Sequence, residues 1–325
     1  MADAAAAAGG RVVRILRPTL TVAAVIAVTW ALIDAVREAG AVPLPRVTWL
    51  MASVALMLAG VLLAGVAWWR LLAGPSLRAL LPSFAQAQLA KYVPGAIWQG
   101  VGQVLGAEQL GSARGRASAA FLVQLWTQLV AATCVGALLV LDRPPPAWTW
   151  LLVLGAVAGL ATLARGALVR VLRVGGRLLR RDAAHAGRQA PAQRDVLLAV
   201  VLGGGTVVLG GWSYAVLLLG PRPQIEVWVV VAAFAAAWVA GFLIVPLPAG
   251  AGVREFVLLA ALGARFGAAA VLAAAVLHRV VTLVAEILLA TWSRLAAARD
   301  SATEHRPQAD VETDGSVVAA EEDEG

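Results

Sequence analysis

Long apolar runs separated by short polar links recur along the chain. Seven of them have about 20 residues each, which is enough for a helix to cross the roughly 30 Å hydrocarbon core of a bilayer. They lie at 12–34, 47–71, 117–141, 147–164, 195–219, 226–246 and 268–292. The pattern predicts an all-α polytopic membrane protein, built as a bundle of transmembrane helices.

Composition and charge agree with this prediction and indicate an orientation. Hydrophobic residues make up 61% of the 325 positions and charged residues only 14%, which is more apolar surface than a soluble fold can bury. The link at 165–194 contains eight arginines and one aspartate, and basic links of this kind stay on the cytoplasmic side. We therefore expect a multi-pass protein of the cytoplasmic (inner) membrane with a cytoplasmic N-terminus. Topology and contact with anionic lipid headgroups account for the arginines, so no nucleic-acid partner is expected.

Three regions are predicted along the chain. Residues 1–11 form an N-terminal cytoplasmic segment, residues 12–299 a helical transmembrane domain and residues 300–325 an acidic tail. The tail has nine acidic residues and one arginine and lacks apolar anchors, so it is predicted to be disordered. It is either a solvated terminus or a segment that binds a protein partner.

Two stretches, 76–103 and 246–263, interrupt the apolar pattern with proline, glycine and polar residues. Within hydrocarbon, non-helical backbone persists only inside protein or beside a water-filled cavity. Apolar sequence flanks the second stretch on both sides, which favours a re-entrant element over an ordinary cytoplasmic loop. We expect a new helix to begin there, near Gly252 or Val253.

The spacing of these two breaks indicates an internal repeat. Pro94 in the first break and Pro248 in the second are 154 positions apart, and the long spans that follow them keep the same offset. Internal repeats of this kind are common in transporters.

The two breaks also contain residues that are suited to binding an anion. Free N–H groups at a helix start attract a phosphate, and Arg254 in the first turn adds a guanidinium suited to bidentate contact. Glu255 either orients that arginine, contacts a cationic headgroup or carries a proton. In the first break, Lys91 and Tyr92 either hold a phosphate or belong to an amphipathic helix at the membrane interface.

The last span carries polar groups on one face. His278, Thr282 and Glu286 recur every four residues, and Arg279 lies seven residues before Glu286. Ionisable groups are costly in hydrocarbon, so these should face the bundle interior or a cavity. His278, Arg279 and Glu286 are candidates for proton coupling. The alternative is an Arg279–Glu286 ion pair that only fixes helix packing.

The span at 117–141 has polar residues at the matching offset. Gln124 and Gln128 lie on one side of it, so they join the candidates for a polar pathway. Hydrogen bonds between neighbouring helices are the simpler explanation for both glutamines.

Nothing in the sequence indicates enzyme chemistry. The three histidines are scattered, no Cys–His spacing suits a metal, and the glycines at 203–205 lack the lysine of a phosphate loop. A glycosyltransferase with a lipid-linked donor would need acidic residues on a substantial outward loop, and the outward links are short. We expect neither a cofactor nor a metal.

The break motifs and the last span resemble a known family. "KYVPGAIWQ" at 91–99, "PLPAGAGVREFVLLAAL" at 246–262 and the later "LHRVVTLVAE" are similar to the lysylphosphatidylglycerol synthetase transmembrane-region family. That family includes the flippase half of bacterial multiple peptide resistance factors and many stand-alone proteins. This chain lacks the soluble aminoacyltransferase domain of the fused members, so we do not expect it to make lysyl-phosphatidylglycerol.

The resemblance implies a bundle of about 7–8 spans with re-entrant elements that moves a lipid between leaflets. The expected substrate has an anionic phosphate head and is either a phospholipid or a polyprenyl-phosphate-linked glycan. By motif position, substrate contact is assigned to Lys91, Tyr92, Pro94, Gly95, Pro248, Gly250, Gly252, Arg254 and Glu255. The alternatives are a non-transporting membrane scaffold and, less in keeping with the loops, a lipid-linked-sugar glycosyltransferase. Assembly into a homo-oligomer is compatible with each role.

Overall fold

The computed structural model describes residues 45–92, 98–142, 145, 147–163, 191–220, 227–243 and 252–304, with side chains through residue 299. All regular structure within these ranges is helical, and they contain no strand. The predicted span at 12–34, the segment 1–11 and the tail beyond residue 304 lie outside the described residues. The same holds for the middle of each break, at 93–97 and 244–251.

The helices fall into two groups that follow one another along the chain. The first group contains α2 (Val47–Leu72), α3 (Leu77–Leu89), the 3₁₀ turn η1 (Ala90–Tyr92), α4 (Trp98–Gln109) and α5 (Arg114–Ala137), which η2 (Leu138–Leu141) extends. Helix α6 (Thr149–Thr162) comes next. The second group contains α9 (Gln193–Leu219), α10 (Val227–Leu243), α11 (Val253–Phe266) and α12 (Ala268–Glu304).

Four described helices are long and apolar enough to cross a membrane. They are α2, α5 with η2, α9, and α12 as far as Arg299. At 1.5 Å per residue, each exceeds the roughly 30 Å of hydrocarbon. Helix α6 turns bulky apolar side chains outward, namely Trp150, Leu151, Leu154 and Val157. Such faces suit lipid rather than water, so these features indicate a multi-pass membrane protein.

Three helix boundaries differ from the prediction. Helix α6 has only 14 residues, so it is about 21 Å long and shorter than the hydrocarbon core, and the described part of α10 has 17 residues, about 26 Å. Helix α12 continues to Glu304, into the tail predicted at 300–325. The residues after Trp292 are rich in alanine and arginine, which are strong helix formers, so the helix runs past the predicted boundary.

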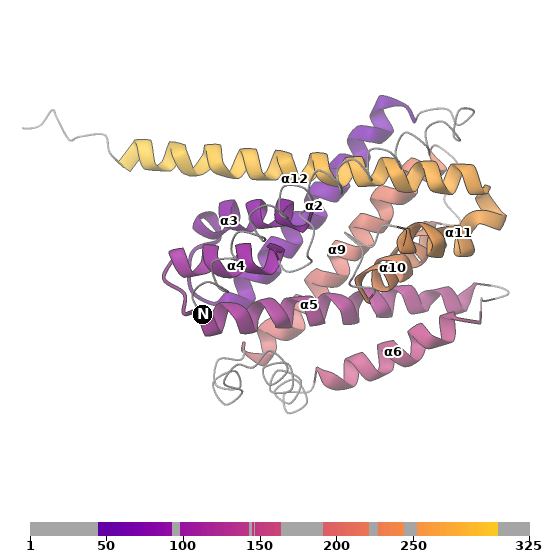
Figure 1. Cartoon of the computed structure of the whole chain (residues 1–325), viewed down its shortest axis with the longest axis horizontal. Helices are drawn as coiled ribbons and strands as arrows, with labels where there is room; N and C mark the ends of the chain where they lie inside the picture. The colour runs from indigo at the N-terminus through magenta and orange to yellow at the C-terminus, as the bar shows by residue number, and fades with distance from the viewer. Residues whose placement is uncertain are drawn as a thin grey trace, which may run out of the picture.

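The helices are arranged around a central pair. In Figure 1, α12 and α5 run along opposite sides of the molecule, and α2 and α9 cross between them. The short helices α3 and α4 pack against each other toward one end, and α10 and α11 pack against each other toward the opposite end. The two breaks therefore belong to two helical hairpins: the first hairpin is α3–α4, and the second hairpin is α10–α11.

Small residues let the central helices α2 and α9 approach closely. The hydroxyls of Ser53 and Ser213 lie 2.8 Å apart, and each also lies within 3.0 Å of the other residue's carbonyl oxygen. Nearby, the hydroxyl of Thr206 donates to the carbonyl oxygen of Gly60 at 3.1 Å. Close backbone contact and interhelical hydrogen bonds of this kind hold helices together where the hydrophobic effect cannot.

Gly211 sets the distance between α9 and α10. A Cβ atom at this position would lie 2.9 Å from Val231 Cγ1 and 3.0 Å from Val231 Cα. We expect Gly211→Ala to lower the free energy of unfolding by about 1–3 kcal/mol, because the added methyl group overpacks the contact. Gly204→Ala on the same helix is the control, since its Cβ would meet Ala131 at an ordinary 3.9 Å. Thermal unfolding in one detergent compares them, and equal midpoints would contradict this packing.

Candidate functional site

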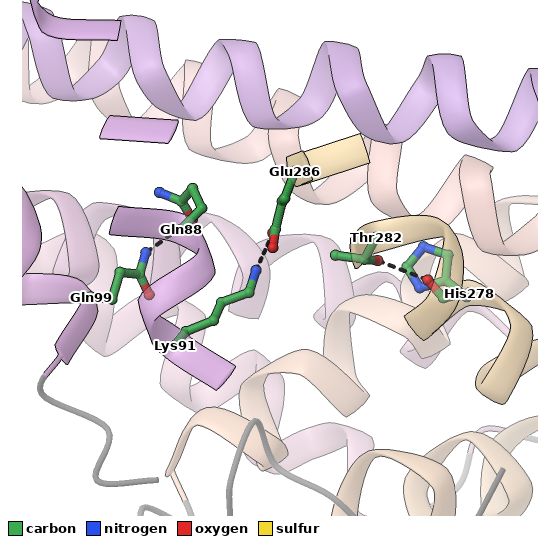
Figure 2. Close-up of polar contacts among 6 residues, drawn as sticks. All are labelled: Gln88, Lys91, Gln99, His278, Thr282 and Glu286. Carbon is green, nitrogen blue, oxygen red and sulfur yellow. Dashed lines mark hydrogen bonds and ion pairs between the residues drawn. The ribbon is translucent and has the colours of Figure 1, made fainter. Parts of the chain in front are cut away.

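The first break is tied to α12 by a buried ion pair. Lys91 in η1 pairs with Glu286 of α12, 195 positions later in the chain (Figure 2). The Glu286 side chain is only 1% exposed, whereas that of Lys91 is 29% exposed. Tyr92, the next residue along, lies in electrostatic contact with the same carboxylate. The predicted residues Lys91, Tyr92 and Glu286 are thus brought together.

The second break is tied to α12 by another ion pair, at Glu255. Its Oε1 accepts a hydrogen bond from Arg279 Nε at 2.8 Å, and Arg279 Nη2 lies 2.7 Å from the same oxygen. Its Oε2 accepts from the backbone N–H of Gly252 at 2.8 Å. Glu255 therefore caps the start of α11 and holds Arg279 at the same time. Gly252, at φ 84°, adopts the left-handed conformation that favours glycine, and the predicted helix start at Val253 is confirmed.

Two pairings that the sequence left open as alternatives are not formed. No hydrogen bond or ion pair joins Glu255 to Arg254, and the two oxygens of Glu255 bond Arg279 and the helix start instead. Arg279 does not pair with Glu286, because each has a partner on a hairpin that packs against α12. The two lie about 10.5 Å apart along the helix axis, so partners from neighbouring helices come within reach first.

Unlike Lys91 and Arg279, Arg254 forms no hydrogen bond or ion pair with a carboxylate of the described residues, although Glu255, its neighbour in sequence, attracts its charge. Its guanidinium lies over the ring of Phe234 on α10, with Cζ 5.4 Å from the ring centroid. Both nearby carboxylates, Glu255 and Glu286, are already paired with other cations. Arg254 is partly buried and lies in electrostatic contact with Tyr92 of the first hairpin. A guanidinium in this position has donors free for a ligand.

His278 lies beside this arginine on the inner face of α12. The imidazole is 5% exposed, hydrogen-bonds the backbone of Gly210, and packs edge-on against Phe234 at 5.0 Å. Its Nε2 is buried and has no partner among the described residues. The hydroxyl of Thr282 donates to the His278 carbonyl at 2.8 Å, so Thr282 satisfies backbone rather than the imidazole (Figure 2).

Gln124, Gln88 and Gln99 form hydrogen bonds between neighbouring helices. Gln124 donates from Nε2 to the carbonyl oxygen of Ala64 on α2 at 2.8 Å, as the simpler explanation requires. Gln128 lies where α5 approaches α9, with its Cα 3.3 Å from the Cβ position of Gly203. Within the first hairpin, Gln99 on α4 donates to Gln88 on α3 at 3.1 Å (Figure 2).

Four predicted site residues, Pro94, Gly95, Pro248 and Gly250, lie outside the described residues. The segments around them, 93–97 and 244–251, contain no ionisable residue. They therefore add no formal charge to the site. Sequence reasoning missed Phe234 and Tyr214, whose rings stack with centroids 6.0 Å apart. Both lie in apolar helices where no polar pattern marks them.

Five side chains make up what we call the charged cluster: Lys91, Arg254, Arg279, Glu255 and Glu286. Three are cations and two are carboxylates, so the cluster has one excess positive formal charge. It joins both hairpins to α12. Because an unbalanced charge is costly away from water, this excess favours an anionic ligand.

No family model matches this chain, and no curated protein matches it in sequence. The resemblance to the lysylphosphatidylglycerol synthetase transmembrane-region family therefore stays a prediction that rests on the break motifs.

Proposed function

We propose that this chain is an integral membrane transporter that moves a lipid with an anionic phosphate head between leaflets. The lipid is either a phospholipid or a polyprenyl-phosphate-linked glycan. The observation that carries the proposal is Arg254, a partly buried cation between two hairpins whose neighbouring carboxylates are both paired elsewhere. A guanidinium so placed is suited to bidentate contact with a phosphate.

Helix lengths and connections support a re-entrant first hairpin. Helices α3 and α4 have 13 and 12 residues, so each is about 20 Å long or less and too short to cross the hydrocarbon core. The hairpin connects the end of α2 to the start of α5. Those two ends lie on the same side, since Arg116 Nη1 donates to the carbonyl oxygen of Ala73 at 3.5 Å. The hairpin thus enters and leaves from one side.

The second hairpin comes from the opposite side. Its outer end is fixed beside the far end of α5, where Arg265 pairs with Asp142 at 3.0 Å. Because α5 is long enough to cross the membrane, its two ends face different sides. The first hairpin begins at one end of α5 and the second at the other, so their tips point toward each other. Helix α10 is apolar and buried along most of its length, as a re-entrant helix must be.

The two hairpins belong to inverted repeats in this proposal. Helices α4 and α11 begin at residues 98 and 253, and α5 and α12 begin at residues 114 and 268. Their offsets of 155 and 154 match the spacing predicted from the prolines. The packing is also reciprocal, because α12 contacts α2 and α3 while α5 contacts α9 and α10. Inverted repeats with a site between interrupted helices are the usual architecture of alternating access.

The inverted arrangement predicts the side that each helix end faces. With the only cysteine, Cys134, replaced by serine, single cysteines at Ser112 and Ala298 should react with an impermeant thiol reagent from one side. A cysteine at Ala269, before the long stretch of α12, should react only from the other side. We propose that the first of these sides is the cytoplasmic one, because Arg114 and Arg116 lie there. Labelling of Ser112→Cys and Ala269→Cys from the same side would contradict inversion.

Transport in this scheme follows from how the hairpins are anchored. The Lys91–Glu286 pair holds the first hairpin to α12, and the Arg279–Glu255 pair holds the second. A phosphate head bound at Arg254 would stay in place while one hairpin moved, giving access from one leaflet and then the other. Glu255, His278 and Glu286 are the candidates for proton coupling, and the lipid's own distribution is the alternative driving force.

Exchange of labelled lipid between leaflets of proteoliposomes tests the proposal. Wild-type protein should exchange fluorescent phosphatidylglycerol or a polyprenyl-phosphate lipid faster than empty liposomes do. Arg254→Gln should slow this exchange by about 100-fold, as expected for a lost charge-assisted contact of roughly 3 kcal/mol. Arg265→Gln on the same helix is the control and should leave the rate unchanged, because Arg265 lies at the outer end of α11. Exchange by folded Arg254→Gln at the wild-type rate would rule out this phosphate role.

A further inference from the structure

We infer that the charged cluster selects a phosphate diester with one negative charge over a phosphate monoester or pyrophosphate with two or more. The inference rests on the proposed function for the identity of the site, and it adds the charge class of the lipid head. Its basis is the number of charges in the cluster and the cation that each carboxylate pairs with.

The two carboxylates balance two of the three cations, so one further negative charge would make the cluster neutral. Glu255 uses Oε1 for Arg279 and Oε2 for the N–H of Gly252, and Glu286 holds Lys91. Arg254 is then the one cation of the cluster without a carboxylate, and the neighbouring break segments contain no ionisable residue. With the imidazole of His278 counted as neutral, the described cluster carries one excess positive charge.

A diester matches this excess in charge and in geometry. Its single negative charge is shared by two non-bridging oxygens, and a guanidinium fork binds two such oxygens with parallel hydrogen bonds. His278 adds no donor to the phosphate, because its imidazole already donates to the backbone of Gly210 and the free Nε2 of a neutral ring is an acceptor. A bound diester makes the site neutral overall.

A doubly charged head leaves the site unbalanced. A monoester dianion has three non-bridging oxygens that share two negative charges, and the charged cluster has no second unpaired cation to balance the second charge. The bound state would then carry one excess negative charge amid apolar helices. That charge is energetically costly for the same reason as the excess positive charge of the empty site. The site thus prefers the lipid head with the smaller negative charge. A basic surface that acted by attraction alone would prefer the head with the larger negative charge.

Binding to purified full-length protein in a neutral detergent tests this selectivity apart from transport. The probes are phosphatidylglycerol and phosphatidic acid with identical acyl chains, at about pH 8.5, where the monoester carries two charges. Diacylglycerol with the same chains reports apolar binding alone. Glycerophosphoglycerol, the diester head without chains, shows whether a soluble phosphate ester is the true ligand.

Wild-type protein should bind phosphatidylglycerol at least about tenfold more tightly than phosphatidic acid, a difference of ~1.4 kcal/mol. Glycerophosphoglycerol should compete only weakly. Glu286→Gln raises the excess to two positive charges and should shift the preference toward phosphatidic acid. Glu255→Gln makes the same charge change at the other ion pair, in case the first variant does not fold. Arg254→Gln removes the excess and should abolish the difference between the two lipids.

Equal or tighter binding of phosphatidic acid to wild-type protein would overturn the inference, as would unchanged selectivity in folded Arg254→Gln. Effective competition by glycerophosphoglycerol would replace the lipid by a soluble diester as the ligand. The two proposals fail separately. If the protein selects the diester but exchanges no lipid, only the proposed transport function is contradicted. If it exchanges both lipids but binds them equally, only the proposed selectivity is contradicted.

Discussion

Replacing Lys91 with methionine is expected to lower the free energy of unfolding by about 3–5 kcal/mol, the largest single effect that the structure predicts. The reason is the state of its partner, Glu286, whose side chain is 1% exposed and pairs with Lys91. Removing the lysine leaves a carboxylate in the interior without a cation. Unfolding in mixed micelles of increasing sodium dodecyl sulfate content, followed by tryptophan fluorescence, measures the change.

Two further variants separate the ion pair from the lysine itself. Lys91→Arg keeps the charge and should retain most of the stability. Lys91→Met combined with Glu286→Leu removes both charges and should regain most of the loss, because a well-packed apolar pair is often as stable as a buried ion pair. A double variant less stable than Lys91→Met alone would mean that the carboxylate is stabilised by other groups and that the pairing is not its main support.

Glu255→Ala is expected to lower the free energy of unfolding by about 2–4 kcal/mol, the second largest effect. It removes two contacts at once: the ion pair with Arg279, and the acceptor for the Gly252 N–H at the start of α11. Because that start positions Arg254, the variant should also slow lipid exchange. The same unfolding and leaflet-exchange assays measure both effects.

Glu108→Ala is the matched control. Glu108 pairs with Arg114 at 3.0 Å, but the arginine is 66% exposed, and exposed pairs contribute about 1 kcal/mol or less. Its removal should change stability little and exchange not at all. If Glu255→Ala and Glu108→Ala had equal effects, the ion pair to α12 would be no more than a surface contact.

The main helices could be predicted from the sequence because their signal is local. The starts and ends of α2 and α9 lie within a few residues of the predicted spans, since an unbroken apolar run of that length has few other solutions in a membrane. Helices α3 and α4 were harder to predict, because α3 contains Pro82 and both are polar. Gln99 on α4 hydrogen-bonds Gln88 on α3 across the hairpin. The sequence pattern of either helix alone does not predict this contact.

The candidate site was predictable in its members but not in its pairings. Lys91, Glu255, Arg279 and Glu286 stood out because charges are rare in apolar sequence, and the structure brings them together. The pairing of cations with carboxylates depends on how each hairpin packs against α12. Lys91 is 195 positions from Glu286, and Glu255 is 24 positions from Arg279, so the periodicity of α12 alone does not predict either pair. Arg254 could be identified as the unmatched cation only after the other four charges had been paired.

The two ion pairs of the charged cluster connect each hairpin to α12. Helix α12 contacts both hairpins at points seven residues apart, at Arg279 and Glu286. A movement of one hairpin relative to α12 would change the distance across one of these pairs. The anchors are thus both the main polar support of the site and the groups that a transport cycle would rearrange.

The most direct test of the central claim, that a lipid phosphate lies at Arg254 between the two hairpins, is photocrosslinking. A phosphatidylglycerol analogue with a photoreactive group beside the phosphate is reconstituted with wild-type protein, and the crosslinked positions are mapped by mass spectrometry. We predict crosslinks in both hairpins, near Tyr92 and near Arg254, that are lost in Arg254→Gln. Crosslinks confined to outward faces, such as Trp150 on α6 and Trp292 on α12, would contradict the account.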